Sequence, residues 1–251
     1  MEGFDAGEVI SLMKDHAGEF NMRYGFIWGC DLPGTHEKMI SGTRVLGQDC
    51  ADIHGLTKAE IEGRRQIRAV MDMVRKYGKS KIALAGLPAY IGIRETRHIK
   101  CLYQVSDEDT MYGRHFEDAI ANGSYRLDVH YQDKSGVSFR YLDGKEVYHP
   151  QDGTDAVWSR WRPATESSPT FYQVPLRSLI PQGTDNVILA GRMLDAAPIA
   201  YSGIRVMVNM NQVGEAAGVT AALALRHGCP ICEVPASEVR SVLSEGNSII
   251  I

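Results

Sequence analysis

Hydrophobic residues recur at helical spacing in the first strong pattern of the chain, between about Lys58 and Tyr77. Apolar positions three and four residues apart lie on one face of a helix, so this segment is expected to be amphipathic. Thr57 and Glu60 have the spacing of a capping box at its start. Gly78 is a common residue at a helix end. The pattern therefore predicts one long helix.

The middle of the chain shows the two-residue alternation of β-strands. Apolar and polar residues alternate from Tyr125 to Tyr131, and again from Val137 to Tyr141. The dipeptide Asp143-Gly144, which follows the second run, is a tight-turn signal. These runs predict strands with one face open to solvent.

A polar stretch from Gln151 to Ser168 follows, with Trp158 and Trp161 embedded in it. It has neither a helical nor a strand period, so a long surface loop is expected. The two tryptophans are interpreted as a local packing cluster, and a wall of a substrate site is the alternative.

The last third of the chain changes character. The run Asn186 to Ala190 is apolar and short, which is typical of a buried strand, and Gly191 stops it. A loop is expected through residue 203. A long helix is then expected from about Arg205 to Arg226, ended by Gly228.

A final amphipathic helix is expected from Ser237 to Ser244, with Ser237 as its cap. The expected order is thus a helix, a β-rich middle and then further helices. The fold class expected is α/β (α+β), with a mixed sheet.

Composition narrows the classes of function. The chain has 251 residues, a net charge of −4 and no run of Lys or Arg, so a nucleic-acid partner is not expected. The longest apolar stretch, Val206 to Leu225, is interrupted by polar residues, so no membrane span is expected. The first residues lack the basic start and apolar core of a signal peptide. These features predict a cytoplasmic protein.

Cysteine and histidine give weak signals of chemistry. Five cysteines are an odd number, which argues against a disulfide framework. Cys229 and Cys232 have the spacing of a redox pair, but they follow a helix end, where the dipole opposes a thiolate. A zinc site needs about four ligands, so no metal site is predicted. Of the scattered histidines, His115 beside Arg114 is the candidate for proton transfer.

Several motifs occur together in the order found in one enzyme family. Taken along the chain, they are Leu56–Gln66, Ile91–Arg97, Gly113–Ala121, Tyr172–Leu179, Val187–Arg192, Ser202–Met207 and Gln212–Gly218. In this order they resemble the FAD-dependent oxidoreductase family, some of whose members are called xanthan lyases. The resemblance runs from about Cys50 to the end.

The resemblance implies FAD as cofactor and a small organic molecule as the hydride-donating substrate. It places a strand ending in Gly-Arg at the cofactor backbone, and the following helix with its amino terminus at the flavin's polar edge. The cofactor-binding residues implied are Gly191, Arg192, Ser202, Gly203, Ile204 and Arg205. The substrate-side candidates are Arg94, Arg97, Tyr201 and His115.

Two positions depart from the family pattern. Tyr201 stands where a histidine is usual, so a hydroxyl replaces an imidazole base. Val208 stands where a proline is usual. The resemblance also implies a division of roles. Residues 1–80 and 181–251 are expected to form a partial flavin-binding domain, and residues 81–180 a β-rich substrate-side domain.

No Gly-x-Gly-x-x-Gly motif occurs in the sequence, although this turn normally holds the diphosphate of FAD. Three explanations remain open: a truncated product, a subunit completed by a separate nucleotide-binding chain or by a homo-oligomer, and a non-catalytic remnant. Each predicts weak or absent FAD binding by the isolated chain. The alternative function is a partner-binding scaffold without flavin.

Overall fold

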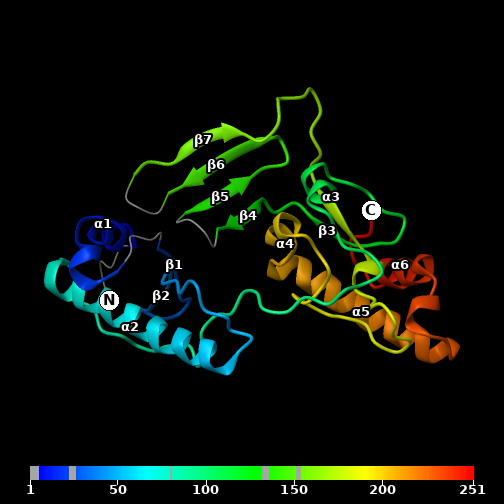
Figure 1. The fold of residues 1–251 in the computed structure, drawn as a ribbon, viewed down its shortest axis with the longest axis horizontal. Helices are drawn as coiled ribbons and strands as arrows, with labels where there is room; N and C mark the ends of the chain where they lie inside the picture. The colour runs from blue at the N-terminus through cyan, green and yellow to red at the C-terminus, as the bar shows by residue number, and fades with distance from the viewer. Residues whose placement is uncertain (1–5, 23–26, 80, 132–135, 151–153) are drawn as a thin grey trace. The chain divides into compact units, whose positions relative to one another are not determined.

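A computed structural model describes residues 6–22, 27–79, 81–131, 136–150 and 154–251. The chain forms two compact units. The first comprises Met1–Thr96, Tyr131–Gly136 and His149–Ala156, and the second comprises Arg97–His130, Val137–Tyr148 and Val157–Ile251. Helices and small antiparallel sheets occur together, which confirms the expected α/β class (Figure 1). No helix in the described ranges has the length and apolarity needed to cross a membrane.

The first unit is built on one long helix. Its elements are α1 (Ala6–His16), the 3-10 turn η1 (Ala17–Phe20), β1 (Trp28–Asp31), β2 (Lys38–Ser41) and α2 (Ile53–Tyr77). The helix predicted from Lys58 is confirmed, but its predicted cap is wrong. Asp52 caps it instead, because the Asp52 carboxylate accepts hydrogen bonds from the N–H groups of His54 and Gly55. Thr57 lies inside the helix.

Packing in the first unit is concentrated where α1 crosses α2. Val9 and Met13 of α1 meet Val70, Met73 and Val74 of α2 in a buried cluster. Pairing these two apolar faces is what makes each helix stable, because isolated helices gain little from propensity alone.

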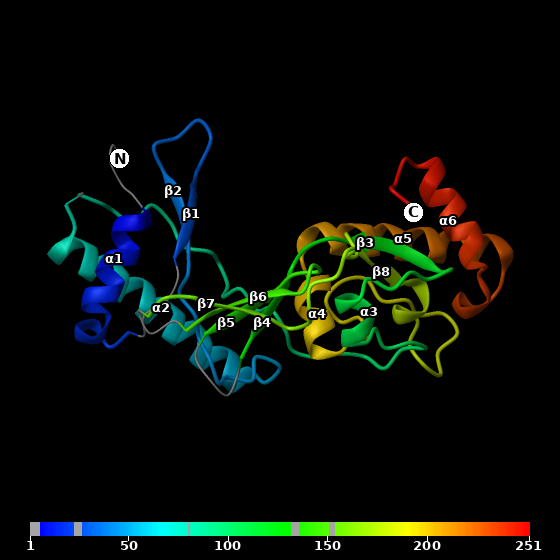
Figure 2. The ribbon, with the colours of Figure 1, turned by 90° about the horizontal axis from the view of Figure 1, so that it is seen from above.

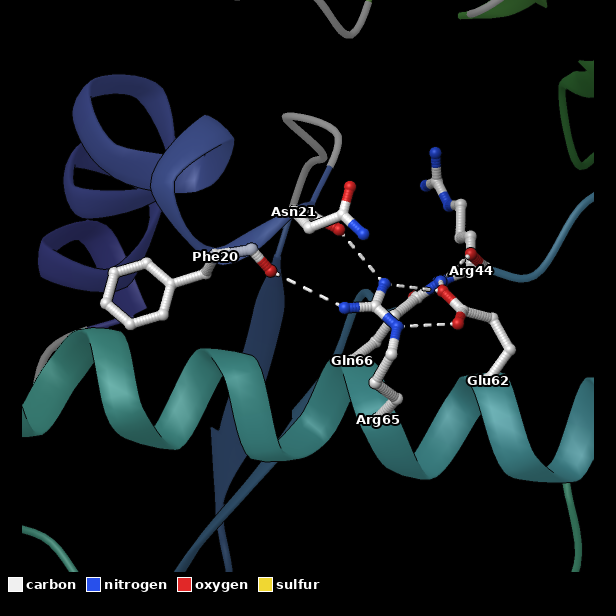
Figure 3. Close-up of polar contacts among 6 residues, drawn as sticks. All are labelled: Phe20, Asn21, Arg44, Glu62, Arg65 and Gln66. Atoms are coloured by element: carbon white, nitrogen blue, oxygen red, sulfur yellow. Dashed lines mark hydrogen bonds and ion pairs between the residues drawn. The ribbon is translucent and has the colours of Figure 1, made fainter.

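Arg65 of α2 ties the turn after α1 to this helix, as Figure 3 shows. Its guanidinium donates to both carboxylate oxygens of Glu62, at 2.6 and 2.7 Å. It also donates to the backbone carbonyls of Phe20 (3.5 Å) and Asn21 (3.0 Å). Beside it, Gln66 bonds both backbone groups of Arg44. Two side chains thus attach two separate segments to one helix.

This network predicts an acidic titration for Glu62. Hydrogen bonds from Arg65, and then from Gln66, lower the pKa of Glu62 to about 2. The stability this adds is present above the unfolded pKa of about 4.3 and is lost as the pH falls toward 2. We expect Arg65→Met to raise the Glu62 pKa, measured by carboxyl 13C NMR. Arg75→Met is the control, and an unchanged Glu62 pKa in Arg65→Met would contradict the assignment.

The second unit holds the larger core. Its helices are α3 (Asp107–Met111), α4 (Pro198–Ile204), α5 (Met207–His227) and α6 (Ala236–Glu245), with 3-10 turns η2 (Leu176–Ser178) and η3 (Ile231–Glu233). Its strands are β3 (Ala119–Gly123), β4 (Leu127–His130), β5 (Val137–Arg140), β6 (Lys145–His149), β7 (Val157–Arg160) and β8 (Tyr172–Pro175).

Two antiparallel sheets organise this unit. β3 pairs with β8, and β4 to β7 form a four-stranded sheet in sequence order. Helix α5 packs along β3, and α6 packs on α5 (Figure 2). The small residues Ala216, Ala217 and Thr220 form much of the buried face of α5, which lets its backbone approach the sheet closely.

Several strand and turn predictions are confirmed and others are wrong. The runs around Leu127–His130 and Val137–Arg140 form β4 and β5, and Gly144, with φ of +86°, turns the chain into β6. The prediction of a loop over residues 151–168 is wrong for part of this segment, because β7 forms there and pairs with β6. Residues 151–153 lie outside the described ranges. Strand pairing overrides the polar character of that segment.

In the carboxyl-terminal third, too, some predicted elements are confirmed and others are wrong. Residues 186–190 are not a strand, because only Leu189 of them is buried and its N–H bonds Leu179 instead of a strand ladder. The loop predicted through residue 203 contains helix α4. The long helix is confirmed as α5 and ends at Gly228, whose φ is +63°. The last helix is confirmed, but Pro235 precedes it and Ser237 is not its cap.

Candidate functional site

An open groove lies in the second unit where the end of β3 meets the first turn of α5. Its volume is about 540 Å³, within the range of small-molecule sites. The residues that line it are Asn122, Ser124, Tyr125, Arg126, Tyr141, Val208, Asn209 and Gln212. Asn122 comes from β3, Ser124, Tyr125 and Arg126 from the link between β3 and β4, Tyr141 from just after β5, and the other three from α5.

The amide side chains of the groove are held by hydrogen bonds within the protein. Gln212 accepts from the N–H of Asn122 at 2.9 Å and donates to the carbonyl of Asn122 at 3.1 Å. The Asn122 side chain in turn accepts from Gln173 and donates to the carbonyl of Ile249. These bonds attach α5 to the edge of β3. They also use the hydrogen-bonding groups of these amides within the protein.

Below the groove, Asn209 donates to the carbonyl of Gly203 at 3.2 Å and to the hydroxyl of Tyr172 at 3.4 Å. The Tyr172 hydroxyl donates to the carbonyl of Tyr125. Tyr172 is fully buried, and burial raises the pKa of its hydroxyl. The floor of the groove is therefore a neutral, hydrogen-bonded layer.

The beginning of α5 opens into the groove without a side-chain cap. Val206 precedes the helix and offers no capping group, while Met207 and Val208 are 83% and 65% exposed. The first N–H groups of a helix carry a partial positive charge, so this end favours a negative charge or a polar carbonyl.

The beginning of α4, by contrast, is already occupied. The carboxylate of Asp107 accepts from the N–H groups of Ile199 (3.0 Å) and Ala200 (2.9 Å). This carboxylate satisfies the same donors that an external anion would use. The available helix terminus in this region is thus that of α5.

Three of the cofactor-binding residues predicted from sequence lie in α4 and are buried. Ser202 donates to the carbonyl of Ile199 at 2.6 Å, and Ile204 is fully buried. A Cβ added at Gly203 would lie 2.5 Å from Leu127 Cδ2. The close approach that Gly203 permits is therefore to the protein core.

Arg205 follows α4 and turns toward β4. Its guanidinium donates to the carbonyl of Asp128 at 3.2 Å and lies 3.8 Å from the Asp128 carboxylate. Gly191 has φ of +109°, and a Cβ there would meet nothing within 4 Å. Arg192 beside it is exposed. Gly191 is thus a turn with open space next to it, separate from the residues that line the groove.

The substrate-side candidates have different surroundings. Tyr201 is 2% exposed, and its ring meets His98 edge to face at 4.6 Å. His115 is exposed and stacks on Phe171. Arg97 lies in the second unit and Arg94 in the first, and both are exposed. Their catalytic roles, like the cofactor contacts above, stay predictions.

Sequence reasoning missed most of the groove. The alternating pattern makes Arg126 a residue on the solvent-facing side of a strand, and Asn209 and Gln212 stand only as polar interruptions of an apolar stretch. Their three-residue spacing puts both amides on one helix face. That spacing, at the start of a small-residue helix, was the available signal.

Comparison with known families gives one match. Residues 10–243 match the family model described as FAD dependent oxidoreductase. No curated protein and no solved structure matches the chain at a significant level. The family match covers both units, and it begins well before residue 50, where the resemblance carried by the motifs starts.

Proposed function

Because the chain belongs to the FAD-dependent oxidoreductase family, we propose that it supplies the flavin-facing and substrate-side part of such an enzyme. The reaction proposed is hydride transfer from a small organic substrate. When bound, FAD supplies the hydride acceptor. The observation that carries this proposal is the uncapped start of α5 beside a groove of suitable volume.

The groove residues fit the polar edge of a flavin ring. That edge gains negative charge on reduction, and the positive end of a 21-residue helix stabilises such a charge. Val208 exposes an apolar surface against which a flat ring can pack. Gly203 does not contribute open space, because Leu127 and Tyr172 fill it. The beginning of α5 is therefore the favoured cofactor contact.

The fixed geometry of the groove supports orientation of a ligand. Asn122, Gln212 and Asn209 are held by hydrogen bonds within the protein, so the wall needs no rearrangement on binding. Tyr125 and Tyr141 give the opposite part of the lining an aromatic surface. A flat organic ligand can pack against such a surface.

A separate nucleotide-binding segment is proposed as the partner. The sequence contains no Gly-x-Gly-x-x-Gly turn, and the described groove offers one helix terminus and no glycine-rich loop. The diphosphate of FAD would then be held by that segment. The groove alone would recognise the ring.

This proposal predicts that the chain binds the flavin ring weakly, and that the nucleotide part of FAD adds little to the affinity. Lumiflavin and FAD are expected to bind with affinities within about threefold of each other, measured by flavin fluorescence. Val208→Trp fills the groove and should weaken both at least tenfold. Leu225→Trp, at an 85% exposed site near the other end of α5, is the matched control.

Two results would contradict it. If FAD bound more than tenfold tighter than lumiflavin, the chain would hold the diphosphate itself and would need no partner segment. If neither flavin bound, or if both tryptophan variants behaved alike, the groove would not be the flavin site.

A further inference from the structure

We propose that Arg126 is the anion-recognition residue of this groove and that its ligand is the planar carboxylate of an organic acid. Taken as the substrate, such an acid deepens the proposed function and rests on it. The binding of a carboxylate by Arg126 does not depend on the flavin. All of the residues involved belong to the second unit.

Arg126 lines the groove, and one of its nitrogen atoms makes no hydrogen bond to the described residues. Its Nε is buried and has no hydrogen-bond partner in the described part of the chain. A buried donor without a partner is rare in folded proteins, because its lost hydration is not replaced. An arginine adds a full charge to that cost. Because Nε itself is closed to solvent, an anion in the groove would be bound by the outer Nη donors of the same guanidinium, and it would offset the charge at that buried atom.

Aromatic packing holds the guanidinium in place. Its central carbon lies 3.8 Å from the ring centroid of Phe139 and 5.8 Å from that of Tyr125. Stacking on a ring uses the face of the guanidinium and leaves the donors along its edge available. A stacked arginine with an open edge is pre-organised for two parallel hydrogen bonds to one carboxylate.

Neighbouring groups do not compete for this role. Asp128, two residues further along, is engaged by Arg205 at 3.8 Å and by His130 at 3.0 Å. The Gln212 amide bonds the backbone of Asn122, and the Asn122 side chain bonds Gln173 and the carbonyl of Ile249. Arg126 is the cation among the eight lining residues, and none of the eight is acidic.

One cation with aromatic neighbours favours a singly charged ligand. A carboxylate is neutralised by one guanidinium, and its organic part can lie against Tyr125 and Tyr141. A phosphate dianion would keep an uncompensated charge beside those rings, which costs solvation energy. The lining therefore selects for a carboxylate attached to an organic group.

The test uses the full chain and an isosteric pair of probes, benzoate and benzamide. The Nε–Hε resonance of Arg126, identified by its loss in Arg126→Lys, is followed by 1H–15N NMR. Benzoate is expected to shift it and benzamide is not. Arg126→Lys should weaken benzoate binding at least tenfold, because the forked, stacked donor is lost. Arg160→Lys, on the exposed strand β7, is the control and should bind normally.

The wild-type resonance keeps the test decisive even if Arg126→Lys folds poorly. Equal shifts with benzoate and benzamide, or tighter binding of inorganic phosphate, would overturn the carboxylate assignment. A shift caused by lumiflavin and not by benzoate would overturn it too, by placing Arg126 at the flavin. If lumiflavin fails to bind while benzoate still shifts the resonance, the proposed flavin site is contradicted and the anion site is supported.

Discussion

Gly203→Ala is expected to destabilise the second unit by about 3 kcal/mol through overpacking. The added methyl group would lie 2.5 Å from Leu127 Cδ2 and 2.9 Å from the Tyr172 hydroxyl. Both neighbours are buried, and Tyr172 is held through its hydroxyl. Alanine is favoured over glycine inside a helix by at most about 1 kcal/mol. The clash outweighs that gain, so the net change is unfavourable.

Gly214→Ala is the matched control for this substitution. Gly214 also lies within a helix, α5, but a Cβ there would meet nothing within 4 Å. It should stabilise by about 0.5–1 kcal/mol through helix propensity alone. Urea unfolding of the three proteins, followed by far-UV circular dichroism, gives the comparison.

A double-mutant cycle locates the cause of the Gly203→Ala effect. In a Leu127→Ala background, Gly203→Ala should cost at least about 1 kcal/mol less, because one of the two clashing groups is gone. Equal costs in both backgrounds would show that Gly203 is not packed against Leu127. Gly203 would then remain available as the open, flavin-facing position that the family resemblance implies.

The elements predicted correctly are those with an uninterrupted local period. Helices α2 and α5 and strands β4 and β5 each repeat their apolar positions at the spacing that their backbone requires. Errors came where two signals competed. Asp52 and Thr57 are both good caps, and only the extended backbone at Asp52 decides between them. An apolar run such as residues 186–190 does not reveal whether a pairing strand exists.

The groove could not be predicted, because its walls are distant in sequence. Asn122 and Gln212 are 90 positions apart, and their mutual hydrogen bonds exist only after α5 packs along β3. The alternating pattern places Arg126 within a strand, but the residue precedes β4, and its stacking on Phe139 depends on how the sheet pairs. The order of the motifs identified the family, whereas the geometry of the site depends on tertiary structure.

Asp109→Ala is expected to destabilise the second unit by about 3 kcal/mol. The Asp109 side chain is 3% exposed and accepts from the Tyr103 hydroxyl at 2.6 Å and the Ser106 N–H at 2.8 Å. Arg114 donates to its other oxygen at 3.1 Å. Alanine would leave the first two donors without an acceptor. Arg114 is exposed and would return to water, so it adds little to the loss.

The matched control is Glu238→Ala, which removes a partly exposed partner of His227 in the same unit. An exposed ion pair contributes at most about 1 kcal/mol, so this variant should unfold close to the wild type in urea. Equal destabilisation by both substitutions would contradict the assignment of Asp109 as a buried acceptor, since exposure and partner number would then have no effect.

The charge of Asp109 can be tested separately with Asp109→Asn. Burial by itself would raise the pKa of Asp109, but hydrogen bonds from Tyr103 and then Ser106 outweigh it, and the pKa is lowered. The stability that this carboxylate adds is therefore complete above its unfolded pKa of about 3.9 and is lost as the pH falls through the lower folded pKa. The difference in unfolding free energy between wild type and Asp109→Asn should be constant near neutral pH and shrink below about pH 4. A difference that stayed constant down to pH 2 would show that the polar contacts, and not the charge, account for the effect.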